Sequence, residues 1–378
     1  MDGKYLQEAS IGMALMDALP VLCFCGTIGC LAMIWDSPLF LLGGILCIAA
    51  GVGKVLWKLI LAAAKRNVAV LNKQFRYLMG GGFLLILLSL AAGYQNIRPD
   101  VIWKNLAWFP GNLCFGVGIA GMILMGILAV KLDPASRKAN WLEQSVNLAA
   151  QLAVLFGVVL IWYGSDSYAA DETAIKAVES TESVAVREIE DGLLFDGEGE
   201  EQALVFYPGA KVDHLAYAPL MKRLAEKGID CFLIEMPYHM AIFGKDKAEG
   251  LMEKYAYENW YVGGHSLGGA MAASYASEHL EELDGAVLLA AYPTQSLDRE
   301  GFRVLSLYGS EDGVLNMEKL EEGEQYMPEG AVLHCIEGGN HAWFGSYGEQ
   351  KGDNEAAISH EDQWEETAEW ILELTAGS

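Results

Sequence analysis

Five long apolar stretches without Asp, Glu, Lys or Arg occupy most of residues 1–165, and they constrain the fold more than any other feature. They lie between Asp17 and Asp36, Asp36 and Lys54, Arg76 and Arg98, Lys104 and Lys131, and Glu143 and Asp166. A helix that crosses a hydrocarbon core of about 30 Å needs roughly 20 mainly apolar residues. Since five such stretches leave almost no polar face for a soluble bundle, we expect residues 1–165 to form an all-α transmembrane domain of about five helices.

Lys and Arg collect in two of the connections between these stretches. One connection contains Lys54, Lys58, Lys65, Arg66, Lys73 and Arg76, and the other contains Lys131, Arg137 and Lys138. Basic residues favour the cytoplasmic side. We therefore expect a multi-pass protein of the plasma membrane, with the lipid bilayer as a partner and the chain after Asp166 on the extracytoplasmic side. Asp17 and Lys54, near the ends of their stretches, are expected to snorkel to the interface rather than to line an ion path.

The acidic residues lie mainly in the second part of the chain. Residues 1–165 contain 12 Lys and Arg against 7 Asp and Glu, whereas residues 166–378 contain 13 against 43. Such an acidic surface would repel phosphates, so nucleic acid is not an expected partner. Residues 166–182 are polar and acidic without an apolar run, and we interpret them as a connector. The sequence leaves open whether this connector extends the fifth helix or forms a flexible stalk.

From residue 183 to 378, short apolar segments alternate with segments of helical periodicity. The expected strands are 183–189, 191–197, 203–209, 231–237, 259–266, 285–293, 303–312 and 331–339, and the expected helices are 216–228, 246–258, 267–280, 316–327 and 360–375. This alternation predicts an α/β domain with a doubly wound, mostly parallel sheet. The first two strands read as a hairpin.

The sequence GGHSLGG at residues 263–269 carries the strongest indication of chemistry. Gly264, Ser266 and Gly268 form a G-x-S-x-G motif between an expected strand and an expected helix. In that setting the serine lies on a tight turn that exposes its hydroxyl above the sheet, and its neighbours must be small. We therefore expect Ser266 to be a nucleophile.

A serine nucleophile needs a base and a group that orients this base, and in such folds the order along the chain is serine, acid, histidine. Asp312 is at the C-terminal tip of one expected strand and His341 follows another, where loops leave the carboxyl edge of the sheet. Glu311 is the alternative acid. The backbone N–H groups of Leu267 and Ala210 are expected to form the oxyanion hole.

Two further histidines lie close to these segments. His265, inside the turn, is expected to be structural and to point away from the pocket, and His214 is a candidate for a contact with substrate. The aromatic residues Trp343, Phe344 and Tyr347 form either an apolar wall of the pocket or the packing of the loop that carries His341.

Five segments resemble, in order and spacing, a compact bacterial family of the alpha/beta-hydrolase superfamily that includes dienelactone-hydrolase-like members. They are YPGAKVD, AYAPL, GGHSLGGAMAA, YGSEDGVL and EGGNHAWFGSYGEQKGDN. The resemblance covers about residues 183–378 and implies Ser266, Asp312 and His341 as a catalytic triad for hydrolysis of an ester-type bond. Dienelactone hydrolases proper have cysteine where this chain has Ser266, which favours ordinary esters or thioesters.

The sequence therefore predicts a membrane-anchored serine hydrolase that forms an acyl-enzyme on Ser266, with a small-molecule or lipid ester as substrate. The alternatives are a non-catalytic membrane scaffold or sensor with a hydrolase-like binding module, and an acyltransferase. Without a Cys-x-x-Cys pair, an H-E-x-x-H motif, a phosphate loop or a dinucleotide fingerprint, we expect no metal and no cofactor. The oligomeric state does not follow from the sequence.

Overall fold

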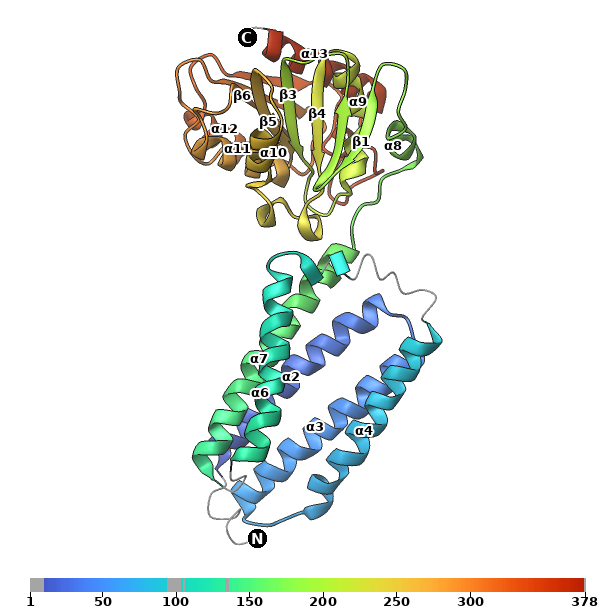
Figure 1. Cartoon of the computed structure of the whole chain (residues 1–378), viewed down its shortest axis with the longest axis vertical. Helices are drawn as coiled ribbons and strands as arrows, with labels where there is room; N and C mark the ends of the chain where they lie inside the picture. The colour runs from blue at the N-terminus through green and yellow to red at the C-terminus, as the bar shows by residue number, and fades with distance from the viewer. Residues whose placement is uncertain (1–9, 94–102, 105, 133–135, 377–378) are drawn as a thin grey trace. The chain divides into compact units, whose positions relative to one another are not determined.

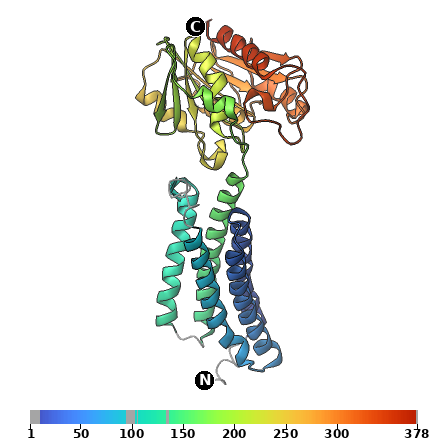
Figure 2. The ribbon, with the colours of Figure 1, turned by 90° about the vertical axis from the view of Figure 1, so that its right-hand side faces the viewer.

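The computed structural model describes residues 10–93, 103–104, 106–132 and 136–376. Arg98, which marks the end of one expected stretch, lies outside these residues. The chain divides into two compact units, residues 1–165 and 166–378 (Figure 1). Figure 2 shows the same ribbon turned by 90°.

Five helices of the first unit are long and apolar enough to cross a membrane, as the sequence predicts. They are α2 (Ile11–Ile34), α3 (Pro38–Ala64), α4 (Ala69–Ala92), α6 (Gly111–Lys131) and α7 (Arg137–Ser165). The side chains of Ser10 and Ser37 cap the first two by accepting backbone N–H groups. The helices extend beyond the uncharged stretches, so that Asp17 lies within α2, and Lys54 and Lys58 lie within α3.

Small residues allow α3 and α4 to approach closely. A Cβ atom on Gly43 would lie 2.6 Å from the carbonyl oxygen of Gly82, and a Cβ atom on Gly82 would lie 2.5 Å from Cys47 Sγ. Neither position has room for a larger residue unless the helices separate. Close approach at glycine is the usual way in which helices gain packing contacts where lipid supplies no hydrophobic driving force.

Asp17 does not extend toward an interface. Its side chain is only 7% exposed and forms an ion pair with the Lys58 ammonium of α3. The Lys54 ammonium lies 4.6 Å from the ring centroid of Phe75 in α4. The snorkelling expected of Asp17 is therefore wrong, because the rotation of α2 turns this carboxylate toward a basic residue of the neighbouring helix.

The second unit contains an eight-stranded sheet with the order β1-β2-β4-β3-β5-β6-β7-β8. The strands are β1 (Ala185–Ile189), β2 (Gly192–Asp196), β3 (Gln202–Tyr207), β4 (Ile229–Ile234), β5 (Asn259–His265), β6 (Gly285–Leu289), β7 (Arg303–Gly309) and β8 (Val332–Ile336). β1 and β2 form the expected antiparallel hairpin, β2 pairs antiparallel with β4, and every other pairing in the sheet is parallel. A mostly parallel sheet is what the alternation of strands and helices predicts.

Helices cover both faces of this sheet, so its central strands are apolar on both sides. In β3, Leu204 and Phe206 face a core shared with α9 (Ala218–Glu226) and α13 (His360–Ala376). The alternate residues of β3 face a second core shared with α10 (Lys247–Lys254) and α11 (Leu267–Glu278). A further helix, α12 (Met317–Gly323), follows β7.

The connector is neither an extension of α7 nor a stalk. α7 ends at Ser165, and a separate short helix, α8 (Glu172–Ala177), begins after a cap in which Asp171 Oδ1 accepts the N–H groups of Thr173 and Ala174. Ala174 is fully buried. The acidic segment is therefore folded onto the second unit, and its side chains supply caps and contacts that composition alone does not indicate.

Candidate active site

Ser266 lies on a strained turn between β5 and α11. Its backbone has φ 53° and ψ −123°, a left-handed region that a residue with a Cβ atom rarely adopts. The N–H of Ser266 donates to the carbonyl oxygen of Leu289 in β6 at 2.9 Å, which fixes the turn against the neighbouring strand. Strain of this kind persists where the surrounding structure enforces it, and it is typical of functional sites.

The two glycines that flank Ser266 are required by close backbone contacts. A Cβ atom on Gly264 would lie 2.5 Å from the carbonyl oxygen of Tyr207, and one on Gly268 would lie 2.2 Å from the same oxygen. This oxygen belongs to the end of β3, which pairs with β5 so that Tyr207 lies opposite Gly264. The start of α11 therefore lies directly on the end of β3, as the spacing of the motif requires.

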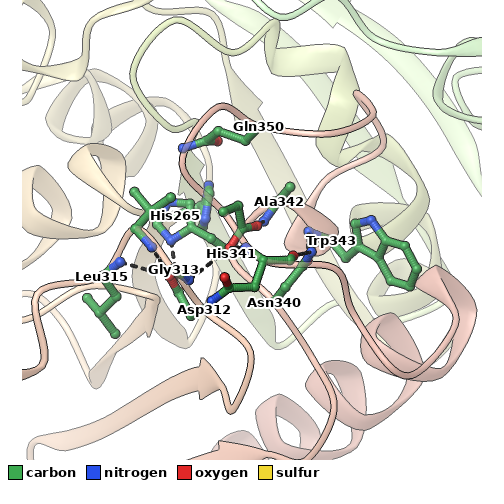
Figure 3. A network of polar contacts seen from close by, with 12 residues as sticks. His265, Asp312, Gly313, Leu315, Asn340, His341, Ala342, Trp343 and Gln350 are labelled. Atoms are coloured by element: carbon green, nitrogen blue, oxygen red, sulfur yellow. Dashed lines mark hydrogen bonds and ion pairs between the residues drawn. The ribbon is translucent and has the colours of Figure 1, made fainter.

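Asp312 and His341 form a buried pair. Asp312 Oδ2 lies 2.8 Å from His341 Nδ1, and each side chain is 1% exposed (Figure 3). The other carboxylate oxygen, Oδ1, accepts the backbone N–H groups of Val314 and Leu315 at 2.8 and 2.7 Å. An acceptor at Nδ1 places a proton on this nitrogen and leaves the lone pair of a neutral imidazole on Nε2.

The third predicted residue, Ser266, directly follows a histidine whose ring contacts this pair. The ring of His265, which directly precedes Ser266, has its centroid 4.5 Å from that of His341. Within the described part of the chain, His341 Nε2 has no hydrogen-bond partner, so the structure pairs Asp312 with His341 but does not hydrogen-bond Ser266 to His341. The carboxylate of Glu311, the alternative acid, instead accepts a hydrogen bond from the Ser310 hydroxyl at 3.2 Å.

The two N–H groups expected in the oxyanion hole belong to adjacent segments. Leu267 is the first residue of α11, and Ala210 lies in the loop of residues 208–213 that follows β3. Among the described residues, neither N–H donates a hydrogen bond. The N-terminal end of α11 also carries a partial positive charge that favours a developing anion.

A tyrosine and a histidine link this loop to the turn. The Tyr217 hydroxyl accepts the N–H of Gly209 at 3.1 Å and lies 2.7 Å from His265 Nδ1. A Cβ atom on Gly209 would lie 2.9 Å from the same nitrogen, so glycine is needed here for close approach. The residue of this loop with a left-handed backbone is Lys211, with φ 59°.

Burial keeps both members of this link neutral. It raises the pKa of the Tyr217 phenol. It also lowers the pKa of His265 well below its ordinary value, with the nearby His341 as a smaller cause. His265 does not point away from the site as expected, because its ring lies against that of His341. Sequence reasoning missed Tyr217, which has no motif of its own.

Asp353 joins the loops that carry Asp312 and His341. Its Oδ1 accepts the N–H of Gly313 at 3.0 Å, and its Oδ2 accepts the N–H of Ala342 at 2.8 Å. Gly313 and Ala342 are the residues that directly follow the acid and the histidine. One carboxylate therefore fixes the spacing of the two loops, a role that the sequence alone does not indicate.

The three aromatic residues after His341 pack the loop instead of standing free in a pocket. Phe344 is fully buried, Tyr347 is buried, and the ring of Trp343 stacks on that of His360 with centroids 4.1 Å apart. Of the two interpretations, the structure favours loop packing. Among the described residues, no group of three His, Cys, Asp or Glu side chains is arranged to hold a metal ion, and all seven cysteines are free thiols.

Residues 203–365 match the model of a protein family described as the alpha/beta hydrolase family. Similar solved structures include Est1E from Butyrivibrio proteoclasticus (15% identity, 51% of this chain and 99% of that chain, TM-score 0.38). Others are a predicted CIB-like hydrolase from Thermoplasma acidophilum (16%, 51% and 100%, 0.37) and MGS-MChE2, an alpha/beta hydrolase enzyme from a sediment metagenome of the Mar Chica lagoon (16%, 50% and 98%, 0.39). A comparison with curated protein sequences gave no match. Residues 203–365 are therefore an alpha/beta-hydrolase domain, preceded by helices long and apolar enough to span a membrane.

Proposed function

We propose that this chain is a membrane-anchored serine hydrolase that cleaves carboxylic ester or thioester bonds through an acyl-enzyme on Ser266. The observation that supports the proposal is the buried Asp312–His341 pair, together with a serine on a strained turn whose preceding residue, His265, has its ring against that of His341. A residue with a Cβ atom rarely adopts a positive φ outside functional sites. A buried carboxylate beside a histidine orients the imidazole for proton transfer.

The proposed reaction uses each group at a stated atom. His341 Nε2 accepts the proton of Ser266 Oγ while this oxygen forms a bond to the carbonyl carbon of the substrate. The N–H groups of Leu267 and Ala210 stabilise the resulting oxyanion. When the tetrahedral intermediate collapses, His341 returns the proton to the departing alcohol or thiol, and the acyl group stays on Ser266. Water then repeats the sequence, with His341 as base, and releases the acid.

The five apolar helices support the membrane part of the proposal. We assign residues 1–165 as the transmembrane domain, with the hydrolase on the extracytoplasmic side of the plasma membrane, on the distribution of Lys and Arg. Protease added to intact cells should then degrade the second unit. In the control, an inhibitor of the added protease should prevent this degradation. If the second unit were protected until the cells were lysed, the orientation would be reversed.

Covalent labelling tests the nucleophile. A fluorophosphonate probe should label the full-length protein in membranes. Ser266→Ala should abolish this labelling and should lower kcat for hydrolysis of p-nitrophenyl esters by at least about 10³-fold. Ser274→Ala, which changes another serine of α11, is the matched control and should behave as wild type. Labelling that survives in Ser266→Ala would remove the assignment, and a wild-type protein that neither reacts nor turns over esters would favour a non-catalytic role.

A further inference from the structure

The residues that directly follow α7 lie against two loops of the candidate active site. We call residues 166–171 the strap, residues 208–213 the oxyanion loop and residues 337–354 the histidine loop. Only Asp166 and Ser167 separate Tyr168 from the last residue of α7. The strap has no motif and belongs to the segment that composition marks as a connector.

Tyr168 pairs with the oxyanion loop through its backbone. Its N–H donates to the carbonyl oxygen of Lys211 at 2.6 Å, and its carbonyl oxygen accepts the N–H of Asp213 at 2.9 Å. These two bonds form an isolated parallel bridge opposite Val212. At the strap end, the Lys211 ammonium also donates to the Asp166 carboxylate at 2.6 Å.

The side chain of Tyr168 contacts the histidine loop. Its ring centroid lies 5.6 Å from that of Tyr347, and its hydroxyl accepts the N–H of Lys351 at 3.2 Å. Asp171 adds a second connection, because its N–H donates to the carbonyl oxygen of Ser346 at 2.9 Å and its Oδ1 accepts the Ser346 hydroxyl at 2.7 Å. One short segment therefore holds both the loop with Ala210 and the loop with His341.

We propose that Tyr168 is a positioning residue for the hydrolase reaction and that the strap is part of the active site. The inference rests on the proposed function. Ala210 directly precedes Lys211, and this loop belongs to no helix or strand, so its backbone direction depends on the few hydrogen bonds that fix Gly209, Lys211 and Asp213. Two of these bonds come from Tyr168. Loss of an oxyanion donor costs about 10²–10³ in kcat, and a misplacement of about 1 Å can cost 10²-fold.

The test compares proline substitutions in the full-length protein in detergent. Tyr168→Pro removes the N–H that donates to Lys211, as well as the ring and hydroxyl. Glu172→Pro is the matched control, since Glu172 is the exposed first residue of α8, a position where proline is well tolerated. Tyr168→Phe loses only the hydroxyl, and Tyr168→Ala also loses the ring but keeps the backbone bridge.

The readouts are kcat and KM for a p-nitrophenyl ester, with active sites counted by the end point of fluorophosphonate labelling. An oxyanion donor acts mainly in the transition state, so Tyr168→Pro should lower kcat per active site by about 10- to 100-fold and leave KM within twofold. Hydrogen exchange of residues 208–213 should become faster. Glu172→Pro should stay within about threefold of wild type. Tyr168→Phe and Tyr168→Ala keep the backbone bridge and should therefore lower kcat less than Tyr168→Pro.

The kcat per active site of Tyr168→Pro decides whether Tyr168 has a positioning role. A kcat per active site within twofold of wild type in Tyr168→Pro would refute the positioning role, and so would a loss that appears only as fewer active sites. If Tyr168→Pro does not fold, Tyr168→Gly decides, because it removes the ring and hydroxyl that contact the histidine loop and also loosens the backbone that forms the bridge. A kcat lowered at least threefold at constant KM supports the role, and an unchanged kcat refutes it. Because every value is compared with an active wild type, failure of the proposed function would show separately as a wild type without turnover or labelling.

Discussion

Replacing Asp312 by asparagine tests the proposed chemistry at a single atom. Two backbone N–H groups, from Val314 and Leu315, point at Oδ1, so the amide oxygen of asparagine must occupy that position. The amide nitrogen then replaces Oδ2 and presents N–H to His341 Nδ1. Since Nδ1 must now accept a hydrogen bond, the imidazole carries its proton on Nε2.

The magnitude follows from this change of tautomer. With a proton on Nε2, His341 has no lone pair on this nitrogen to accept the proton of Ser266, although both side chains stay in place. The same exchange in a serine-histidine-aspartate site lowers kcat by about 10⁴-fold, which corresponds to about 5.4 kcal/mol of transition-state stabilisation. Because asparagine has nearly the shape of aspartate, the free energy of unfolding should change little.

The assay is hydrolysis of p-nitrophenyl acetate by the full-length protein, with thermal unfolding as a check on the fold. Glu311→Gln is the matched control, because it neutralises the neighbouring carboxylate, which accepts a hydrogen bond from Ser310 instead of the histidine. This variant should keep kcat within twofold of wild type. An Asp312→Asn protein that keeps more than a tenth of the wild-type kcat would refute the reasoning. So would an equal loss in Glu311→Gln.

Three further predictions concern the support of the site. Gly268→Ala should prevent folding of the second unit, as judged by expression and trypsin resistance, because its Cβ atom would lie 2.2 Å from a backbone oxygen, whereas Gly250→Ala in α10 has open space and should stabilise the fold by up to about 1 kcal/mol. Asp353→Asn should lower kcat by about tenfold and the unfolding free energy by about 2 kcal/mol, measured by chemical denaturation, because only one of its oxygens remains to accept N–H groups from two loops. Burial keeps His265 neutral by lowering its pKa, while the unfolded chain binds a proton below about pH 6.5, so the unfolding free energy should fall as pH drops below this value, by up to about 1.4 kcal/mol per pH unit. His265→Gln should reduce this slope, and an unchanged slope would contradict the explanation.

The long apolar helices and the sheet could be predicted because both depend on patterns within short segments. An apolar run of about 20 residues and an alternation of strands with helices are local signals. The partner of Asp17 could not be predicted in this way. Its contact with Lys58 depends on how α2 and α3 are rotated against each other, which no local pattern in the sequence records.

The residues of the candidate site also differ in whether a local pattern in the sequence marks them. Ser266, Asp312 and His341 stand out because each follows a strand that ends at one edge of the sheet, and their catalytic roles stay predictions. Tyr168 and Asp353 act on backbone N–H and carbonyl groups of distant loops. The bonds of Tyr168 to the oxyanion loop use its backbone and so place few demands on residue type, and the carboxylate of Asp353 is one of many acidic side chains in this part of the chain, so neither leaves a periodicity or motif to find.

The bridge at Tyr168 limits where the apolar helices and the alpha/beta-hydrolase domain can be separated, in evolution or in engineering. A module joined by a loose tether can be cut free, or moved to another anchor, at any point of the tether. In this chain the backbone bridge to a sheet-end loop of the second unit, at Tyr168, comes three residues after the last apolar helix ends. A graft of the second unit would have to retain the sequence from Asp166 onward, since a junction at residue 183 would remove part of this unit together with the apolar helices.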